Sequence, residues 1–230
     1  MKEYYRTLKN NPGITVLECP IPFNYAKLNN IAAKKARGNY LIFLNNDIEV
    51  ITPEWMEELL MYAQRDDVAA VGAMLYYPDD TIQHAGIVLG MGPDRAAGNM
   101  FCHQPRKSIG YMGRLCYSQN LSAVTAACMM VEVKKFRKIG GFDESFTVAY
   151  NDVDLCLRFR KAGYLIVWTP YAELYHYESQ TRGYENSQEK KKRFAEEAQR
   201  FRTRWKKELE AGDPYYNPNF SLDREDFSLR

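Results

Sequence analysis

The fold of this chain is decided by the stretch Leu41-Ile42-Phe43-Leu44-Asn45-Asn46-Asp47. Four consecutive apolar residues predict a strand buried on both faces, as in a parallel sheet covered by helices. The strand stops in three polar residues, and ligands of open α/β sheets bind just beyond the carboxyl ends of strands. Asp47 is well placed there to hold a divalent cation through oxygen. A plain turn explains 45–47 equally well, because Asn and Asp favour turns.

Helices and strands alternate on both sides of this stretch. A short strand is expected at 14–18, followed by a helix at 24–37 that Asn24 would cap. Thr52-Pro53-Glu54 predicts the start of a helix ending near residue 66, with Trp55, Leu59 and Tyr62 or Ala63 facing inward. A buried strand follows at 68–75. The alternation predicts an α/β fold with a mostly parallel sheet flanked by helices.

The second half is expected to continue the same domain. We expect a long loop at 90–120, an apolar run at 121–133, helices at 134–139 and 152–162, a strand at 164–168, a charged helix at 188–210 and a surface tail at 211–230. Residues 1–187 would form the main domain, and 188–230 would be its C-terminal helix and tail. Only one short strand precedes the Asp47 strand, so the domain is expected to be partial at its N-terminus.

Composition excludes several classes of protein. A net charge of +2 indicates neither a nucleic-acid nor a membrane partner. The five cysteines form no C-x-x-C pair, which is typical of free thiols in a reducing cytoplasm rather than of a zinc site. No stretch has 18 apolar residues, so no membrane span is predicted. The basic helix 188–210 could contact an anionic membrane surface, but a solvated face explains it better.

A second acidic cluster lies between residues 140 and 158. Gly140-Gly141-Phe142-Asp143-Glu144 is followed by a helix that begins near Asn151 and Asp152. Asp154 and Arg158 are four residues apart, so a structural ion pair is the better interpretation of Asp154. Asp152 could cap the helix, or it could accept a proton from a bound hydroxyl.

Four motifs occur in order at 44–50, 140–144, 151–158 and 176–183, and together they carry a resemblance. From about residue 14 to its end, the chain is similar to family 2 glycosyltransferases of the GT-A fold. It most resembles the O-antigen and rhamnan type, which builds bacterial cell-surface polysaccharides. The resemblance implies a Rossmann-like α/β fold that here lacks its N-terminal strand or strands.

The resemblance also implies roles for single residues. The donor would be a UDP- or TDP-linked sugar and the acceptor a saccharide, with Asp47 and His176 as ligands of Mn²⁺ or Mg²⁺ and Asp152 as the catalytic base of an inverting transfer. Donor contacts are expected from Asn24, Lys27, Asn30, Asn45, Asn46 and Arg182, and acceptor contacts from His84, Asn151 and Thr125. The alternatives are a solvated lysine for Lys27, a surface ion-pair partner for Arg182, and a buried, hydrogen-bonded histidine for His84.

Departures from the family pattern leave rival functions open. Residues 45–47 carry one carboxylate where many relatives have two, and Asn151 replaces the usual Glu before Asp152. The first hypothesis is a metal-dependent transferase acting on a glycan or lipid-linked glycan at the cytoplasmic side of the membrane, with a homodimer as one way to supply the missing strand. The second is a non-catalytic, transferase-like binding module. A nucleotidyltransferase is disfavoured because no early Gly-rich phosphate loop with a Lys is found.

Overall fold

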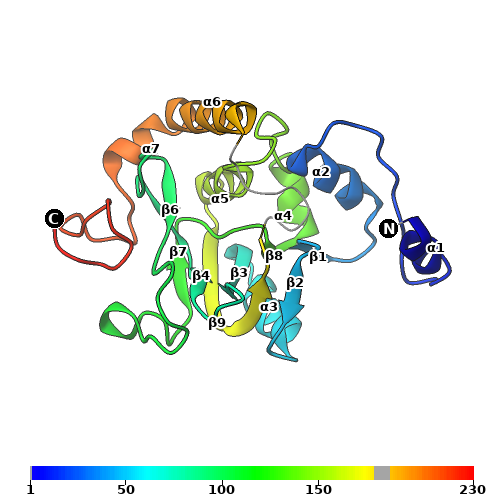
Figure 1. The fold of residues 1–230 in the computed structure, drawn as a ribbon, viewed down its shortest axis with the longest axis horizontal. Coiled ribbons are helices and arrows are strands. Elements are labelled where there is room, and N and C mark those ends of the chain that lie inside the picture. Colours follow the sequence, from blue (N-terminus) through cyan, green and yellow to red (C-terminus); the bar gives the residue numbers. More distant parts are fainter. Residues whose placement is uncertain (1, 179–186) are drawn as a thin grey trace.

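A computed structural model describes residues 2–178 and 187–230 of the chain. One mixed sheet lies between two layers of helices (Figure 1). Helices α2 (Tyr25–Lys35), α4 (Val133–Lys138), α5 (Asn151–Lys161) and α6 (Gln188–Arg204) lie on one side, and α3 (Trp55–Ala63) covers the other. Each face of the sheet has its own hydrophobic cluster, so the predicted α/β class is confirmed.

The main sheet has the strand order β1-β8-β3-β9-β2. These strands span Tyr40–Leu44, Cys128–Glu132, Val68–Tyr76, Leu165–His176 and Ile48–Val50, respectively. Two short strands extend it, because β4 (Ile82–His84) pairs with β3 and β7 (Gln119–Leu121) pairs with β9.

The prediction of a mostly parallel sheet was wrong. Among the described strands only β3 and β9 pair in parallel, and every other pair in the main sheet is antiparallel. The reason is an inserted strand. Strands β1 and β3 run in the same direction on either side of β8, which enters the gap between them antiparallel to both.

Local sequence signals explain several elements. Asn24 caps α2, and its side-chain oxygen accepts a hydrogen bond of 2.8 Å from the backbone N–H of Lys27. Helix α3 buries Trp55, Leu59 and Ala63 at the expected helical spacing. Strand β3 is buried along its whole length. These predictions are confirmed.

Two strand predictions near the N-terminus were wrong. Residues 14–18 form no strand, and Ile14 and Leu17 are 40% and 38% exposed. Strand β1 has β8 as its one partner among the described strands, so it is an edge strand. Its two faces are unequally buried, because Ile42 is only partly buried against the second hydrophobic cluster. Leu41 and Phe43 face the core, whereas Leu44 is 45% exposed. A helix that the sequence did not predict, α1 (Lys2–Lys9), precedes this region.

The middle of the chain is more regular than the predicted loop at 90–120. Strands β5 (Ile87–Leu89) and β6 (Ala97–Asn99) form a separate hairpin, and η1 (Tyr111–Gly113) is a short 3₁₀ turn. The C-terminal tail packs against this region through the stacked rings of Phe227 and Phe101, whose centroids lie 4.7 Å apart.

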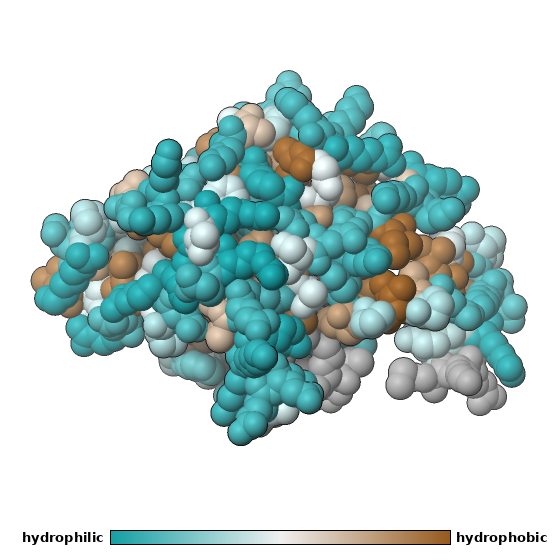
Figure 2. All heavy atoms as spheres, turned by 90° about the horizontal axis from the view of Figure 1, so that it is seen from above, coloured by the Kyte–Doolittle hydropathy of each residue, from teal (hydrophilic) through white to brown (hydrophobic). Residues whose placement is uncertain are grey.

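The predicted basic helix 188–210 is divided in two. Helix α6 ends at Arg204, and α7 (Lys206–Ala211) begins after Trp205, which is buried. Figure 2, which views the molecule from the side of α6, shows mainly hydrophilic residues on this face. No helix among the described residues combines the length and apolar character that a membrane span needs. The solvated interpretation therefore fits the surface of α6.

Candidate functional site

A cavity of about 540 Å³ opens where β1 and β9 end and α5 begins. Its lining includes seven of the predicted site residues, namely Asn45, Asn46, Asp47, Thr125, Asn151, Asp152 and His176. These residues come from segments up to 131 positions apart. The structure therefore gathers most of the predicted site around one opening.

Sheet pairing places Asp47 beside His176. The short strand β2 follows Asp47 directly, and Ile48 lies opposite His176 in the β2–β9 register. The backbone N–H of Tyr177 also donates to the Asp47 carbonyl at 2.9 Å. As a result, Asp47 Oδ1 lies 3.2 Å from His176 Nε2, and each side chain is 11% exposed.

The His176 ring is held in one orientation by Gln83. Its Nδ1 lies 2.6 Å from Gln83 Oε1, which can only accept, so Nδ1 carries the proton and Nε2 keeps a lone pair. The Asn45 amide lies 3.1 Å from Nε2 and donates to it. Burial lowers the pKa of His176, although the nearby Asp47 carboxylate opposes this shift. The neutral imidazole is the form that binds metals.

Asp47 and His176 fit a divalent cation. Among the described residues, the buried Asp47 Oδ1 has no hydrogen-bond partner, because the neighbouring His176 Nε2 carries a lone pair rather than a proton. Two neighbouring ligands bound at about 2.1 Å in an octahedral shell lie roughly 3.0 Å apart, close to the observed 3.2 Å. The described residues contain no group of three or more His, Cys, Asp or Glu suited to a metal.

Asp152 faces the same cavity from the first turn of α5. Its Oδ2 accepts a hydrogen bond of 3.1 Å from the Ala126 N–H, and its Oδ1 accepts one of 2.8 Å from the Val153 N–H. Burial raises the pKa of Asp152, although these hydrogen bonds oppose the shift. The residue at the N-cap is Tyr150, in a left-handed conformation with φ 63°, so the capping interpretation of Asp152 was wrong. The arrangement suits a carboxylate that accepts a proton.

The backbone before Asp152 is fixed by a residue that sequence analysis missed. Glu197 on α6 is only 2% exposed. Its carboxylate accepts hydrogen bonds from the Thr147 N–H and hydroxyl at 2.6 Å each, from the Val148 N–H at 3.1 Å and from the Ala149 N–H at 2.9 Å. Its position in a strongly charged helix gave no signal of burial.

Other lining residues were also missed. Tyr25 donates from its hydroxyl to the Ala126 carbonyl at 2.7 Å, which fixes the segment that holds Asp152. Asn29, one turn along α2 from Tyr25, also lines the cavity. Glu178 follows His176 by two residues, and this spacing of two was the signal that could have placed both side chains on the same face.

Three predicted donor contacts lie outside the lining of this cavity. Asn24 caps α2 and donates to the Glu144 carbonyl at 2.8 Å. Asn30 is buried and exchanges hydrogen bonds of 2.9 and 3.0 Å with the Phe142 backbone. Lys27 is exposed on α2. None of the three lines the cavity, so their placement does not support donor binding.

The three other residues singled out in the sequence are His84, Arg182 and Asp154. His84 is buried behind the cavity wall, where Nδ1 contacts Asn99 Oδ1 at 2.7 Å and Nε2 accepts from the Thr125 N–H at 3.3 Å. Burial lowers its pKa to about 4, so His84 is neutral and supports Thr125 from behind. Arg182 lies outside the described residues. The predicted structural role of Asp154 is confirmed by its 2.8 Å ion pair with Arg158.

Comparison with known proteins finds a family model and several relatives that are similar to this chain. The model of the family described as glycosyl transferase family 2 matches residues 1–140. An uncharacterized protein of Sinorhizobium fredii, y4gI, is 48% identical over 94% of the chain, and the O-antigen biosynthesis protein RfbC of Myxococcus xanthus is 40% identical over 96%. The N-acetylglucosaminyl-diphospho-decaprenol L-rhamnosyltransferase of Mycobacterium tuberculosis is 28% identical over 63%. The chain spans 24%, 17% and 49% of these relatives, respectively.

Two solved structures share the fold at low sequence identity. GalNAc-T7 with UDP, GalNAc and Mn²⁺ matches with a TM-score of 0.64 and 15% identity, over 91% of this chain and 39% of that one. The mannosyltransferase PcManGT from Pyrobaculum calidifontis, in complex with GDP-Man and Mn²⁺, matches with a TM-score of 0.58 and 13% identity, over 91% and 55%. Taken with the family model, which covers more than half of the sequence, these matches show that the chain belongs to glycosyl transferase family 2 and has the GT-A fold.

Proposed function

We propose that this chain catalyses the metal-dependent, inverting transfer of a sugar from a nucleotide-diphosphate donor to a saccharide acceptor in polysaccharide synthesis. One observation carries the proposal. A neutral histidine beside an orphaned carboxylate, and a second carboxylate with a raised pKa, line the same cavity. The first pair suits a cation that holds a diphosphate, and the second suits a general base.

Asp47 and His176 are the residues that would hold Mn²⁺ or Mg²⁺. A bound divalent ion would neutralise charge on the diphosphate as it leaves. An imidazole ligand favours Mn²⁺ over Mg²⁺. Gln83 keeps the imidazole in the ligand tautomer, and Asn45 and Asn46 lie beside it on the donor side of the cavity. The Mn²⁺ complexes of the two structural relatives support this assignment.

Asp152 would act as the base. It would take the proton of the acceptor hydroxyl while that oxygen bonds to the anomeric carbon of the donor. The bond from the same carbon to the diphosphate oxygen breaks on the opposite face, so the configuration inverts and a nucleoside diphosphate leaves. Burial makes Asp152 a stronger base than an exposed Asp, and Thr125 and Asn151 line the cavity beside it on the acceptor side.

The names of the relatives narrow the substrates. One relative is named for O-antigen biosynthesis, and another is named for rhamnosyl transfer to a decaprenol-linked sugar. We therefore propose a UDP- or TDP-linked hexose or rhamnose as donor, and a glycan or lipid-linked glycan as acceptor at the cytoplasmic face of the membrane. Residues 188–230 would belong to the same domain as the catalytic cavity, since Phe201 and Trp205 lie in its hydrophobic core.

The test is a transfer assay with UDP- and TDP-linked sugars, saccharide acceptors and Mn²⁺. We expect release of nucleoside diphosphate that requires both acceptor and metal, and a product whose anomeric configuration, measured by NMR, is opposite to that of the donor. A retained configuration would contradict the assignment of Asp152. Glycan binding without any transfer would favour the non-catalytic module, which the residues Asn45, Asn46 and Asn151 also fit.

A further inference from the structure

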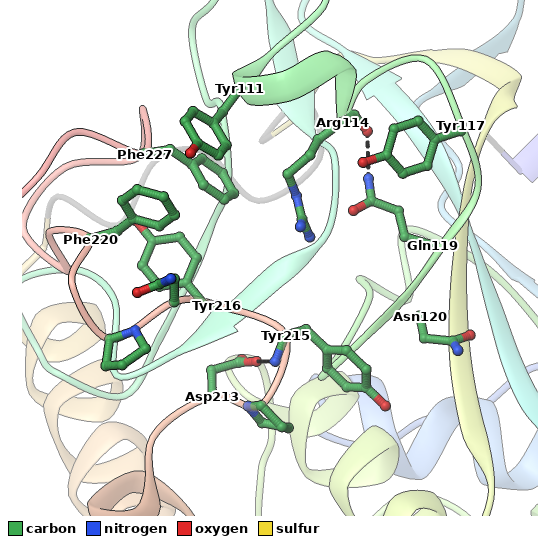
Figure 3. A pocket seen from close by; sticks show the side chains of 13 residues that line it. Tyr111, Arg114, Tyr117, Gln119, Asn120, Asp213, Tyr215, Tyr216, Phe220 and Phe227 are labelled. Carbon is green, nitrogen blue, oxygen red and sulfur yellow. Dashed lines mark hydrogen bonds between the residues drawn. The ribbon is translucent and has the colours of Figure 1, made fainter.

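A second cavity, of about 690 Å³, lies between residues 111–120 and the tail residues 213–227 (Figure 3). It shares no lining residue with the cavity of Asp47 and Asp152. Its strand β7 pairs with the first half of β9, where Gln119 lies opposite Trp168, whereas His176 is at the other end of β9. The second cavity is therefore a separate site.

Aromatic rings form much of its wall. Tyr111 and Tyr117 are 45% and 46% exposed, and Tyr215 lies across the cavity from both of them (Figure 3). Such rings combine an apolar face with a polar hydroxyl. A sugar ring offers the matching surfaces, because its axial C–H groups can stack on an aromatic face while its hydroxyls bind polar groups at the edge.

Arg114, a cation that forms no ion pair with the described residues, lies between these rings. The Arg114 guanidinium projects into the cavity (Figure 3), and among the described residues it makes no hydrogen bond or ion pair. Its Nε is buried, and burial lowers the pKa of Arg114. One carboxylate, Asp213, lines the cavity, but its two oxygens accept the backbone N–H groups of Leu89 and Tyr215 at 2.8 Å each. Arg114 contacts the Phe227 ring at 5.3 Å, and Asp213 is near enough to oppose the lowering of its pKa, but no described carboxylate is within ion-pair distance of it.

An acceptor without a donor lies beside Arg114. Gln119 donates from Nε2 to the Arg114 carbonyl, so Oε1 is the amide atom that remains. Oε1 is buried, and no described residue forms a hydrogen bond with it. An unsatisfied buried polar atom destabilises the protein until a partner reaches it. A ligand that satisfied both residues would carry an anionic oxygen for Arg114 and a hydroxyl for Gln119.

We propose that this second cavity binds a saccharide that carries a carboxylate or a phosphate. Arg114 holds the anionic group with two parallel hydrogen bonds, Gln119 accepts from a sugar hydroxyl, and Tyr111, Tyr117 and Tyr215 stack on the rings. Binding requires neither metal nor nucleotide. The cavity volume is within the range of about 300–1,000 Å³ that is usual for small-molecule sites.

The test is calorimetric titration of the whole chain, in EDTA, with three probes. Trigalacturonic acid carries carboxylates, glucose 6-phosphate carries a phosphate, and maltotriose is neutral. We expect at least one anionic probe to bind roughly tenfold more tightly than maltotriose, because a charge-assisted hydrogen bond contributes about 1.5–3 kcal/mol. The anionic probe that binds more tightly shows whether the site prefers a carboxylate or a phosphate. Equal binding of all three probes, or binding of none, would overturn the proposal.

Variants assign the binding to this cavity. Arg114→Gln should weaken the anionic probe roughly tenfold, and Arg114→Lys should recover only part of the loss, since Lys lacks the planar fork. Arg65→Gln, which changes an exposed arginine paired with Asp67, is the matched control and should bind normally. Asp47→Ala should also bind normally, which separates this site from the transferase site. If Arg114→Gln does not fold, Gln119→Leu and Tyr117→Ala take its place, and unchanged binding in both would contradict the assignment.

Discussion

Glu197 fixes the backbone from which Asp152 projects, although the two residues are on different helices. The Glu197 carboxylate accepts three backbone N–H groups and one hydroxyl from residues 147–149, just before α5 begins. The Thr147 carbonyl in turn accepts from the Tyr25 N–H at 2.8 Å, at the start of α2. Helix α6 thus positions one wall of the cavity that Asp47 and Asp152 line.

Glu197→Gln should destabilise the protein and slow transfer. The amide nitrogen of Gln donates and cannot accept. At least one backbone N–H that donates to Glu197 in the wild type would therefore lose its acceptor. An unsatisfied buried donor costs about 1–3 kcal/mol, which urea denaturation would measure. Glu196→Gln, at the exposed neighbouring position, is the matched control. Equal stability of the two variants would show that Glu197 does not hold the segment.

Asp152→Asn should abolish transfer while leaving nucleotide binding intact. Loss of a general base costs about 10²–10⁴-fold in rate. Asp152 makes no described contact with Asp47 or His176, so the affinity for UDP or TDP with Mn²⁺ should remain near that of the wild type. The measurements are nucleoside diphosphate release and calorimetry on the same sample. Transfer at the wild-type rate would exclude Asp152 as the base.

The pH dependence of transfer should reflect the raised pKa of Asp152. Only the ionised carboxylate accepts a proton, so activity should be full at pH above this pKa and lost as the pH falls through it. Because burial raises the pKa, the loss should begin at a higher pH than the ordinary Asp value of about 3.9 would give. A profile of kcat/KM against pH measures this limb. A fall in kcat/KM whose midpoint lies at or below the ordinary pKa of Asp would argue against a buried base.

Gln83→Leu should weaken metal-dependent nucleotide binding. Leu removes the acceptor that holds the proton on His176 Nδ1, so the ring loses its fixed tautomer and orientation. Loss of such an outer-shell partner costs about 10–100-fold in metal affinity. Gln83→Glu keeps an acceptor at this position and should lose less. Identical Mn²⁺ titrations for wild type and Gln83→Leu would contradict the positioning role of Gln83.

Local patterns predicted the parts of the fold that depend on neighbours in sequence. The spacing of Trp55, Leu59 and Ala63 predicted α3 and its buried face, and the apolar run at 68–75 predicted β3. The relative directions of the strands could not be predicted in this way. It depends on β8, which joins between β1 and β3 from about 60 residues farther along the chain than β3.

The site residues also differ in whether neighbouring residues or distant segments of the chain determine their positions. Asp47 and Asp152 could be predicted because each lies at the end of a recognisable element, and the motif at 176–183 indicated His176. Asn30 lies outside the cavity lining because its amide is held by the backbone of Phe142, which is 112 positions away. Glu197 was missed because nothing local separates one buried acid from its exposed neighbours in a charged helix.

The most direct test of the account is calorimetric titration of this chain with UDP and TDP, with and without Mn²⁺, repeated on Asp47→Ala. The account predicts that at least one nucleotide binds, that binding requires Mn²⁺, and that the variant loses it. His176→Ala should behave in the same way. Nucleotide binding of equal strength without metal, or unchanged Mn²⁺ dependence in Asp47→Ala, would contradict the assignment of Asp47 and His176 as the metal-diphosphate site.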